Sequence, residues 1–207
     1  MNCKLVGSFI QHLEIVLSPG EDFYAERGSL ISLDQGIQKE VKFIGNNLGK
    51  VISAKFSGES IFILRFLNST SILRKIIVGS RCSILPIKLA GESILCKKGA
   101  YIASSEKMEI STKLSANTLL GGIGAKLQKI TGVGTVFLGS IGHPIEIDIR
   151  SGDSIEIDEN HLVALKDIPL SHLSASWSAT NVLGGEGLSL LEIEGPGKVF
   201  ISPGLFI

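Results

Sequence analysis

Apolar and polar residues alternate along several short segments of the chain. Residues 145–149 read IEIDI and residues 154–158 read SIEID, so isoleucines fall on one face and mostly acidic residues on the other. The same alternation occurs over residues 12–17, HLEIVL. A period of two is typical of β-strands with one buried face. Residues 162–165, LVAL, are apolar without interruption, which predicts a strand covered on both faces.

The pattern gives little support for helices. Residues 115–129 are the best helical candidate, but Gly121, Gly122 and Gly124 interrupt them, and glycine disfavours a helix interior. Short strands separated by glycine turns are typical of sandwiches and rolls. The sequence therefore predicts an all-β fold, a β-sandwich or β-roll with little or no helix.

Two motifs recur at fixed spacing. One reads GGIGAKLQKITGVGTVFL over residues 121–138 and GGEGLSLLEIEGPGKVFI over residues 184–201, with five glycines and a Val-Phe pair in matching places. The other is a pair of turn positions eight residues apart, found three times. The pairs are Gly20 with Gly28, Gly91 with Gly99, and Gly152 with Asn160.

These recurrences predict one domain built from three pseudo-repeats, roughly 1–80, 81–142 and 143–207. Asn160 occupies a position that is glycine in the other two copies. Because Asn tolerates left-handed backbone better than most residues, this exchange predicts a left-handed turn rather than a chemical role. The predicted structural turn or bulge positions are Gly20, Gly28, Gly91, Gly99, Gly132, Gly134, Gly152, Asn160, Gly195 and Gly197.

The charge balance and apolar content narrow the function classes. Among the 207 residues, 20 Lys and Arg match 20 Asp and Glu, which argues against a DNA-binding protein, since phosphate contacts need a surplus of basic residues. Apolar residues make up 44%, yet no apolar run reaches the roughly 18 residues of a transmembrane segment. We therefore expect the apolar excess to be buried partly between subunits, in a homo-oligomer.

The cysteines and the N-terminus indicate the compartment. Cys3, Cys82 and Cys96 are an odd number without CxxC spacing, which favours neither a disulfide scaffold nor a zinc site. The first residues lack the apolar stretch of a secretory signal. The expected localisation is cytoplasmic.

The recurring motifs resemble a known family, the altered-inheritance-of-mitochondria (mitochondrial biogenesis) proteins and their prokaryotic relatives of unknown function. The resemblance spans nearly the whole chain and departs from the family at Ser80 and Arg81, where a Pro-Gly turn is usual. It implies three repeats in a double-stranded β-roll of the tryptophan-attenuation-protein type, assembly into a trimer or ring, and no catalytic residues. The segments that carry it run from Leu13 to Glu21, Gly58 to Phe62, Ala90 to Ala103, Gly121 to Phe137, and Gly184 to Phe200.

Four acidic residues suggest one candidate site. If Ser151, Gly152 and Asp153 form a three-residue hairpin loop, Asp148 lies opposite Glu156 and Glu146 opposite Asp158. Such a face would attract a divalent cation or a basic partner. A solvated face, or two strands that belong to different sheets, is the favoured alternative. The candidate acidic face comprises Glu146, Asp148, Glu156 and Asp158.

Other chemistry finds little support in the sequence. The four histidines lack metal-ligand spacing, no G-x-S-x-G nucleophile elbow occurs, and the glycine run 121–134 lacks the G-K-[ST] ending of a phosphate loop. We therefore expect no catalytic residue, metal or cofactor. The predicted function is a non-enzymatic structural or assembly protein that binds itself and an unidentified protein partner. The alternative is a module that holds a small molecule, or less favourably RNA, between repeats or subunits.

Overall fold

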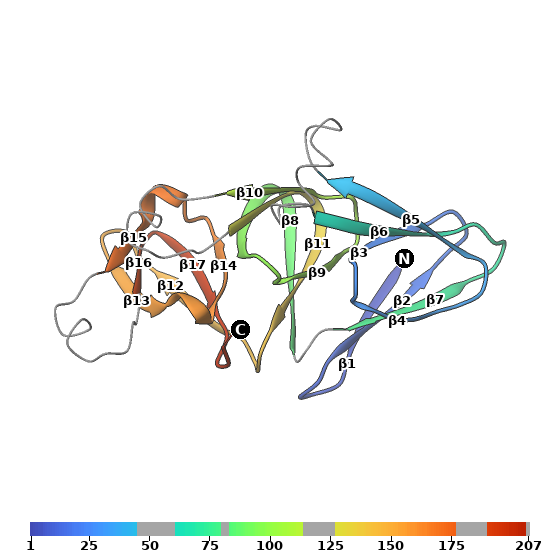
Figure 1. Cartoon of the computed structure of the whole chain (residues 1–207), viewed down its shortest axis with the longest axis horizontal. Helices are drawn as coiled ribbons and strands as arrows, with labels where there is room; N and C mark the ends of the chain where they lie inside the picture. The colour runs from blue at the N-terminus through green and yellow to red at the C-terminus, as the bar shows by residue number, and fades with distance from the viewer. Residues whose placement is uncertain (45–60, 80–82, 114–126, 177–189, 206–207) are drawn as a thin grey trace.

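The computed structural model describes residues 1–44, 61–79, 83–113, 127–176 and 190–205. In this part of the chain the regular elements are β-strands and two short 3-10 helices, which confirms the predicted all-β class. The strands form antiparallel sheets of four, ten and three strands. The N-terminal strands lie at one end of an elongated molecule and the C-terminal strands at the other (Figure 1). Within the described ranges, no helix is long and apolar enough to cross a membrane.

The four-stranded sheet belongs to the N-terminal end and has the order β1-β2-β7-β4. Its central strands β2 and β7 pair over their full lengths, from His12 opposite Gly79 to Leu17 opposite Arg74. The strands are β1 (Asn2–Val6), β2 (His12–Leu17), β4 (Leu30–Leu33) and β7 (Arg74–Gly79).

The ten-stranded sheet runs the length of the molecule in the order β12-β17-β14-β8-β11-β9-β3-β6-β5, with β10 paired to β11. The long antiparallel pair β8 and β11 forms its centre (Figure 1). The strands are β3 (Asp22–Glu26), β5 (Ile37–Ile44), β6 (Ile61–Asn68), β8 (Ser83–Lys97), β9 (Tyr101–Ser104), β10 (Glu109–Lys113), β11 (Leu127–Ser140), β12 (Ile145–Ile149), β14 (Leu162–Lys166) and β17 (Gly197–Ile201).

The three-stranded sheet lies at the C-terminal end in the order β13-β16-β15. The two 3-10 helices are in the same third of the chain, one before β14 and one before β15. The elements are β13 (Ser154–Asp158), β15 (Leu173–Ser176), β16 (Leu190–Glu194), η2 (Glu159–His161) and η3 (Leu170–His172).

Buried apolar side chains fall into three clusters. One lies in the N-terminal third around Phe23 and Phe66, one in the centre around Ile94 and Ile130, and one in the C-terminal third. Strands of the ten-stranded sheet contribute to all three clusters. The two faces of this sheet therefore supply the framework on which the candidate site is built.

The hairpin considered for residues 145–149 and 154–158 does not form, and the favoured alternative of two strands in different sheets is the one observed. β12 pairs with β17 in the ten-stranded sheet, whereas β13 pairs with β16 in the three-stranded sheet. The chain crosses between sheets after Ile149, as it does between β2 and β3 at Gly20. Ile147 and Ile149 of β12 and Ile155 and Ile157 of β13 join the same C-terminal cluster, so the crossing lets two sheets bury their apolar rows against one core.

Candidate functional site

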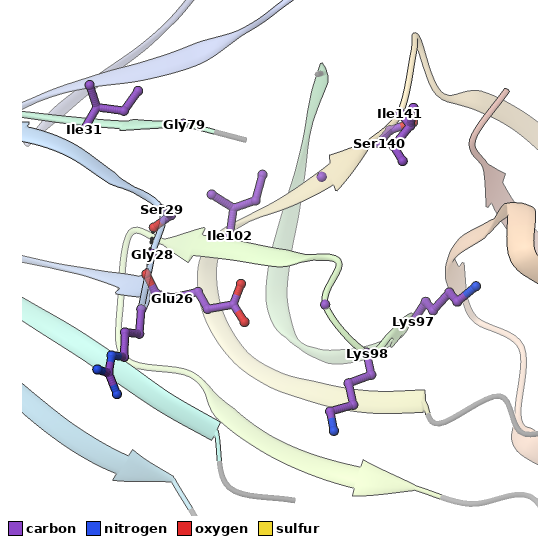
Figure 2. A pocket seen from close by; sticks show the side chains of 13 residues that line it. Glu26, Gly28, Ser29, Ile31, Gly79, Lys97, Lys98, Ile102, Ser140 and Ile141 are labelled. Atoms are coloured by element: carbon purple, nitrogen blue, oxygen red, sulfur yellow. Dashed lines mark hydrogen bonds between the residues drawn. The ribbon is translucent and has the colours of Figure 1, made fainter. Parts of the chain in front are cut away.

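A cleft of about 690 Å³ lies between the N-terminal and central parts of the molecule. Its walls come from the β3–β4 turn, the β8–β9 turn and the end of β11 (Figure 2). These segments meet because β3 pairs with β9 and β9 pairs with β11. The residues that line it include Glu26, Arg27, Ile31, Lys97, Lys98, Ile102, Ser140 and Ile141.

Two glycine turns of the same construction shape the mouth of the cleft. In each turn the amide of the fourth residue donates to the carbonyl of the first, Ser29 to Glu26 at 3.2 Å and Ala100 to Lys97 at 3.0 Å. The third residue, Gly28 or Gly99, has a positive φ of 104° or 88°. A left-handed backbone at this position favours glycine. These turns place Glu26 and Lys97 at the two sides of the cleft.

Glu26 is the acidic group of the cleft, and its carboxyl points into the open space (Figure 2). Burial raises the pKa of this carboxyl from 4.5 to about 7, because a low-dielectric surrounding disfavours its charged form. No ion pair or hydrogen bond reaches the carboxyl from the described ranges. Glu26 therefore carries a costly charge at neutral pH without a counter-charge from this part of the protein.

The Cys96 thiol and the Tyr101 hydroxyl lie close enough to Glu26 for its charge to affect their pKa values. Burial is the main cause that raises the pKa of the Cys96 thiol to about 12, and the charge on Glu26 adds to it. Burial likewise raises the pKa of Tyr101, whose hydroxyl lies 2.9 Å from Ser104 Oγ. Both groups stay protonated at neutral pH, which is the opposite of an activated nucleophile.

The basic residues at the cleft turn away from its centre. Figure 2 shows the side chains of Lys97 and Lys98 leading outward from the β8–β9 turn. The Lys97 Nζ donates to the carbonyl of Glu159 at 3.2 Å and to Asn160 Oδ1 at 3.5 Å. Partial burial lowers the pKa of Lys97. The inner charge of the cleft is therefore that of Glu26, while the cations belong to its rim.

Ser140 forms part of the wall at the end of β11. The residue is 2% exposed, and its hydroxyl finds no hydrogen-bond partner in the described part of the chain. The neighbouring Gly139 amide donates to the carbonyl of Ala100, which ties β11 to the β8–β9 turn. A buried hydroxyl without a partner costs free energy and is uncommon enough in native proteins to mark a position of interest.

A second cleft of about 720 Å³ lies between the central and C-terminal parts. Glu92 lines this cleft and forms an ion pair of 3.5 Å with Lys166, which is not among the lining residues. The Glu92 carboxylate therefore already has a counter-charge. The cleft at Glu26 is therefore the stronger candidate.

The four acidic residues of the predicted face do not come together. Lys198 on β17 pairs with Glu146 and lies 3.2 Å from Asp148 Oδ1, and these contacts raise its pKa. Glu156 lies opposite Glu192 in the three-stranded sheet, and Asp158 accepts a hydrogen bond from the Asn160 amide. In the described residues no group of three or more side chains is placed to hold a metal ion.

The structure also places the predicted turn positions. Gly20, Gly91 and Gly152 have positive φ values of 82°, 114° and 87°, and a Cβ at any of them would meet open space. Asn160 is different, because it lies in the 3-10 helix η2 and lacks a positive φ. The left-handed turn predicted for it is wrong, since the Asp158 side chain caps a helical turn there instead.

The other four glycines occur where chain segments pack closely. A Cβ at Gly132 would overlap Met108 Sδ, and one at Gly134 would come within 2.9 Å of Ser105 Oγ. A Cβ at Gly195 would overlap the carbonyl oxygen of Arg150, and one at Gly197 would lie 2.8 Å from the Lys166 carbonyl. Absence of a side chain is thus required for packing at these positions. The paired GGxG segments at 121–124 and 184–187 lie outside the described residues.

Five of the eleven exposed large apolar residues in the described part of the chain lie on segments near one edge of the molecule. Phe9 and Ile10, 75% and 65% exposed, form the β1–β2 turn, and Ile31 packs over Gly79. Gln11 accepts a hydrogen bond from the Ile84 amide, so this turn lies beside the start of β8. We call the exposed set of Phe9, Ile10, Ile31, Ile145 and Leu205 the apolar edge.

The apolar edge continues from the N-terminal to the C-terminal part. Ser83 at the start of β8 pairs with Ser140, and the carbonyl of Ile141 accepts a hydrogen bond from Gly204 at 2.9 Å. Figure 1 shows the β1–β2 turn, the β11–β12 turn and the segment after β17 along the same, lower side. Residues at both ends of the chain therefore contribute to one surface.

Comparison with protein families matches nearly the whole chain. The model of the family described as mitochondrial biogenesis AIM24 matches residues 3–204. This chain belongs to the AIM24 family. The membership confirms the resemblance inferred from the repeated motifs.

A solved structure shows the same fold as this AIM24 family member. The crystal structure of protein SPYM3_0169 from Streptococcus pyogenes superimposes with a TM-score of 0.74, covering 99% of this chain and 94% of that protein. The two sequences are 21% identical, so the likeness concerns the fold alone. No curated protein matches this chain by sequence.

Sequence reasoning missed the Glu26 cleft. Gly28 and Gly99 were expected as turns, but nothing in the local sequence marks Glu26 or Ser140, which are 114 positions apart. Strand pairing from β3 through β9 to β11 brings them to one cleft. The available signal was the spacing of eight residues within each glycine pair, which marks the turns at Gly28 and Gly99 as equivalent.

Proposed function

We propose that this AIM24 family member is a non-enzymatic, self-associating interaction protein, in which a second copy of the chain covers the apolar edge. The apolar edge itself is the observation that carries this proposal. Phe9, Ile10 and Ile31 are each more than half exposed, and large apolar residues exposed near one another are typical of an interaction site.

The charge of the chain supports a copy of itself as the partner. Its formal net charge is zero, so two copies do not repel each other at long range, and proteins near zero net charge associate readily. The apolar edge has an N-terminal part, with Phe9 and Ile10, and a C-terminal part, with Ile145 and Leu205, and a head-to-tail contact would join the first part of one copy to the second part of the next. Such heterologous contacts close into rings, trimers included, when the rotation allows.

The internal architecture proposed with this function is three pseudo-repeats in a β-roll of the attenuation-protein type. The matching turns at Gly28 and Gly99, each closed by the same hydrogen bond, support a repeated unit. The central apolar cluster contains residues of all three proposed repeats, among them Tyr24, Ile130 and Phe200, which supports their packing around one continuous core.

The experiment is size-exclusion chromatography with light scattering on the wild-type chain and the F9S/I10S double variant. We expect the wild type to elute as an oligomer and the double variant to lose mass, because two apolar side chains leave the contact. V133S is the matched control, since Val133 is also 65% exposed but lies in the middle of β11. Equal loss of mass in V133S and F9S/I10S would contradict the assignment of the edge.

The cleft at Glu26 supports a second function, a module that holds a small molecule between repeats. Clefts of several hundred Å³ with apolar walls and a few polar groups are typical ligand sites, and this one combines about 690 Å³ with Glu26 and three isoleucines. Native mass spectrometry of protein from its natural source tests it. A small retained mass that E26Q fails to retain supports the function, and identical bare masses for both proteins oppose it.

A further inference from the structure

The inner surface of the Glu26 cleft combines one acidic group with apolar walls. Ile31 belongs to β4, Ile102 to β9, and Ile141 follows the last residue of β11 (Figure 2). The Glu26 carboxyl points into the space among these walls. This arrangement favours an amphipathic occupant rather than a wholly polar one.

The environment of Glu26 indicates the charge of that occupant. The rim cations Arg27, Lys97 and Lys98 do not lower the pKa of the carboxyl, for which burial is the cause of the shift. Lys97 is instead bonded to the Glu159 carbonyl and to Asn160. An opposite charge close to a desolvated carboxylate offsets the cost of its burial, and the described residues do not provide one there.

We propose that this cleft binds a small primary amine, whose ammonium group donates hydrogen bonds to the Glu26 carboxylate while its apolar body packs against Ile31, Ile102 and Ile141. An ammonium group has three donors and suits a carboxylate acceptor. Ser140 in the wall offers its unpartnered hydroxyl to a polar group elsewhere on the ligand. The proposal rests on the second function given above and specifies its ligand.

Affinity for an amine then depends on pH through Glu26. An alkylammonium stays protonated up to about pH 10, as a lysine side chain does, whereas Glu26 loses its proton around pH 7. The buried titratable groups beside Glu26 are Cys96 and Tyr101, and both remain neutral in this range. The basic groups at the cleft are Arg27, Lys97 and Lys98 at its rim. The ionised fraction of Glu26 rises about tenfold between pH 6 and pH 8 for a pKa near 7, so amine affinity is expected to rise by the same factor.

Calorimetric titration of the full-length protein with pentylamine, and with hexanoate as a probe of similar shape and opposite charge, tests the proposal. We expect saturable binding of pentylamine at pH 8 and much weaker binding of hexanoate. E26Q should weaken pentylamine binding at least tenfold, whereas E109Q, an exposed glutamate on β10, should leave it unchanged. Methyl resonances of Ile31, Ile102 and Ile141 should shift with pentylamine and not with hexanoate.

Each result decides the matter. Absence of pentylamine binding, equal binding of hexanoate, or an unchanged affinity in E26Q overturns the amine assignment. I141S provides a second variant at a partly exposed cleft residue outside the apolar edge, and we expect it to weaken pentylamine binding about threefold, within the ~0.8 kcal/mol per buried methylene of apolar contact. If native mass spectrometry still finds an E26Q-sensitive ligand while pentylamine fails, the ligand chemistry is wrong and the small-molecule function stands.

Discussion

Replacement of Glu26 by Gln should stabilise the protein at alkaline pH and leave its stability unchanged at acidic pH. The carboxyl has a pKa of about 7 in the folded protein against 4.5 for the free group. The folded state thus binds a proton more tightly than the unfolded state, so this group favours folding below pH 4.5. Its contribution is lost progressively as the pH rises through 7.

The magnitude follows from the size of the shift. A difference of about 2.5 pKa units corresponds to at most about 3.4 kcal/mol of unfolding free energy. Glu26 keeps contact with solvent on the cleft side, and solvent screening reduces the effect. We therefore expect E26Q to be more stable than the wild type by about 1–2 kcal/mol at pH 8, because Gln carries no charge to desolvate.

Urea unfolding at pH 4.5 and pH 8, at one protein concentration, measures the effect. The difference between E26Q and the wild type should be close to zero at pH 4.5 and appear at pH 8. E109Q should show no such pH-dependent gain, because Glu109 is exposed. An E26Q variant that is less stable than the wild type at pH 8, or equally shifted at both pH values, would refute the reasoning about Glu26.

Two further predictions concern packing. G195A should cost at least about 2 kcal/mol of unfolding free energy, because its Cβ meets the Arg150 carbonyl. G152A should cost about 1 kcal/mol, since its Cβ faces open space and only the left-handed backbone penalises it. Thermal unfolding that ranks the two variants in the reverse order would contradict the structure. N68A should lower the unfolding free energy in urea by about 3 kcal/mol. The fully buried Asn68 side chain donates hydrogen bonds to the Leu17 and Ile72 carbonyls, and the variant would lose both. A loss below 1 kcal/mol would contradict this assignment.

The strands were predictable from the sequence because apolar and polar residues alternate along a strand that has one buried face. Residues 12–17 and 145–149 alternate and are strands, and residues 162–165 are continuously apolar and form the fully buried part of β14. Glycine spacing was also informative, since Gly20 and Gly28 have the left-handed backbone that their recurrence indicates.

Strand pairing was less predictable, because alternation fixes the face of a strand but not its neighbour. Ile149 and Ile155 suit a hairpin and a crossing between two sheets equally well, and the structure has the crossing. Asn160 shows a second limit, because a side-chain cap from Asp158 stabilises a 3-10 turn that sequence position alone does not reveal.

The candidate site was beyond local sequence reasoning for a physical reason. Glu26 becomes unusual through burial rather than through its neighbours in sequence, and burial depends on strands that are distant in the chain. Ser140 acquires its position through pairing of β11 with β8 and β9. No spacing in the sequence relates Glu26 to Ser140, because the two residues come to line one cleft only after the strands of the ten-stranded sheet have paired.

Self-association through the apolar edge is the central claim, and sedimentation velocity of the full chain at micromolar concentration tests it most directly. We predict a species whose mass is a multiple of 22.0 kDa and which dissociates in F9S/I10S but not in V133S. A wild-type protein that stays a stable 22.0 kDa monomer across the concentration range would contradict the account.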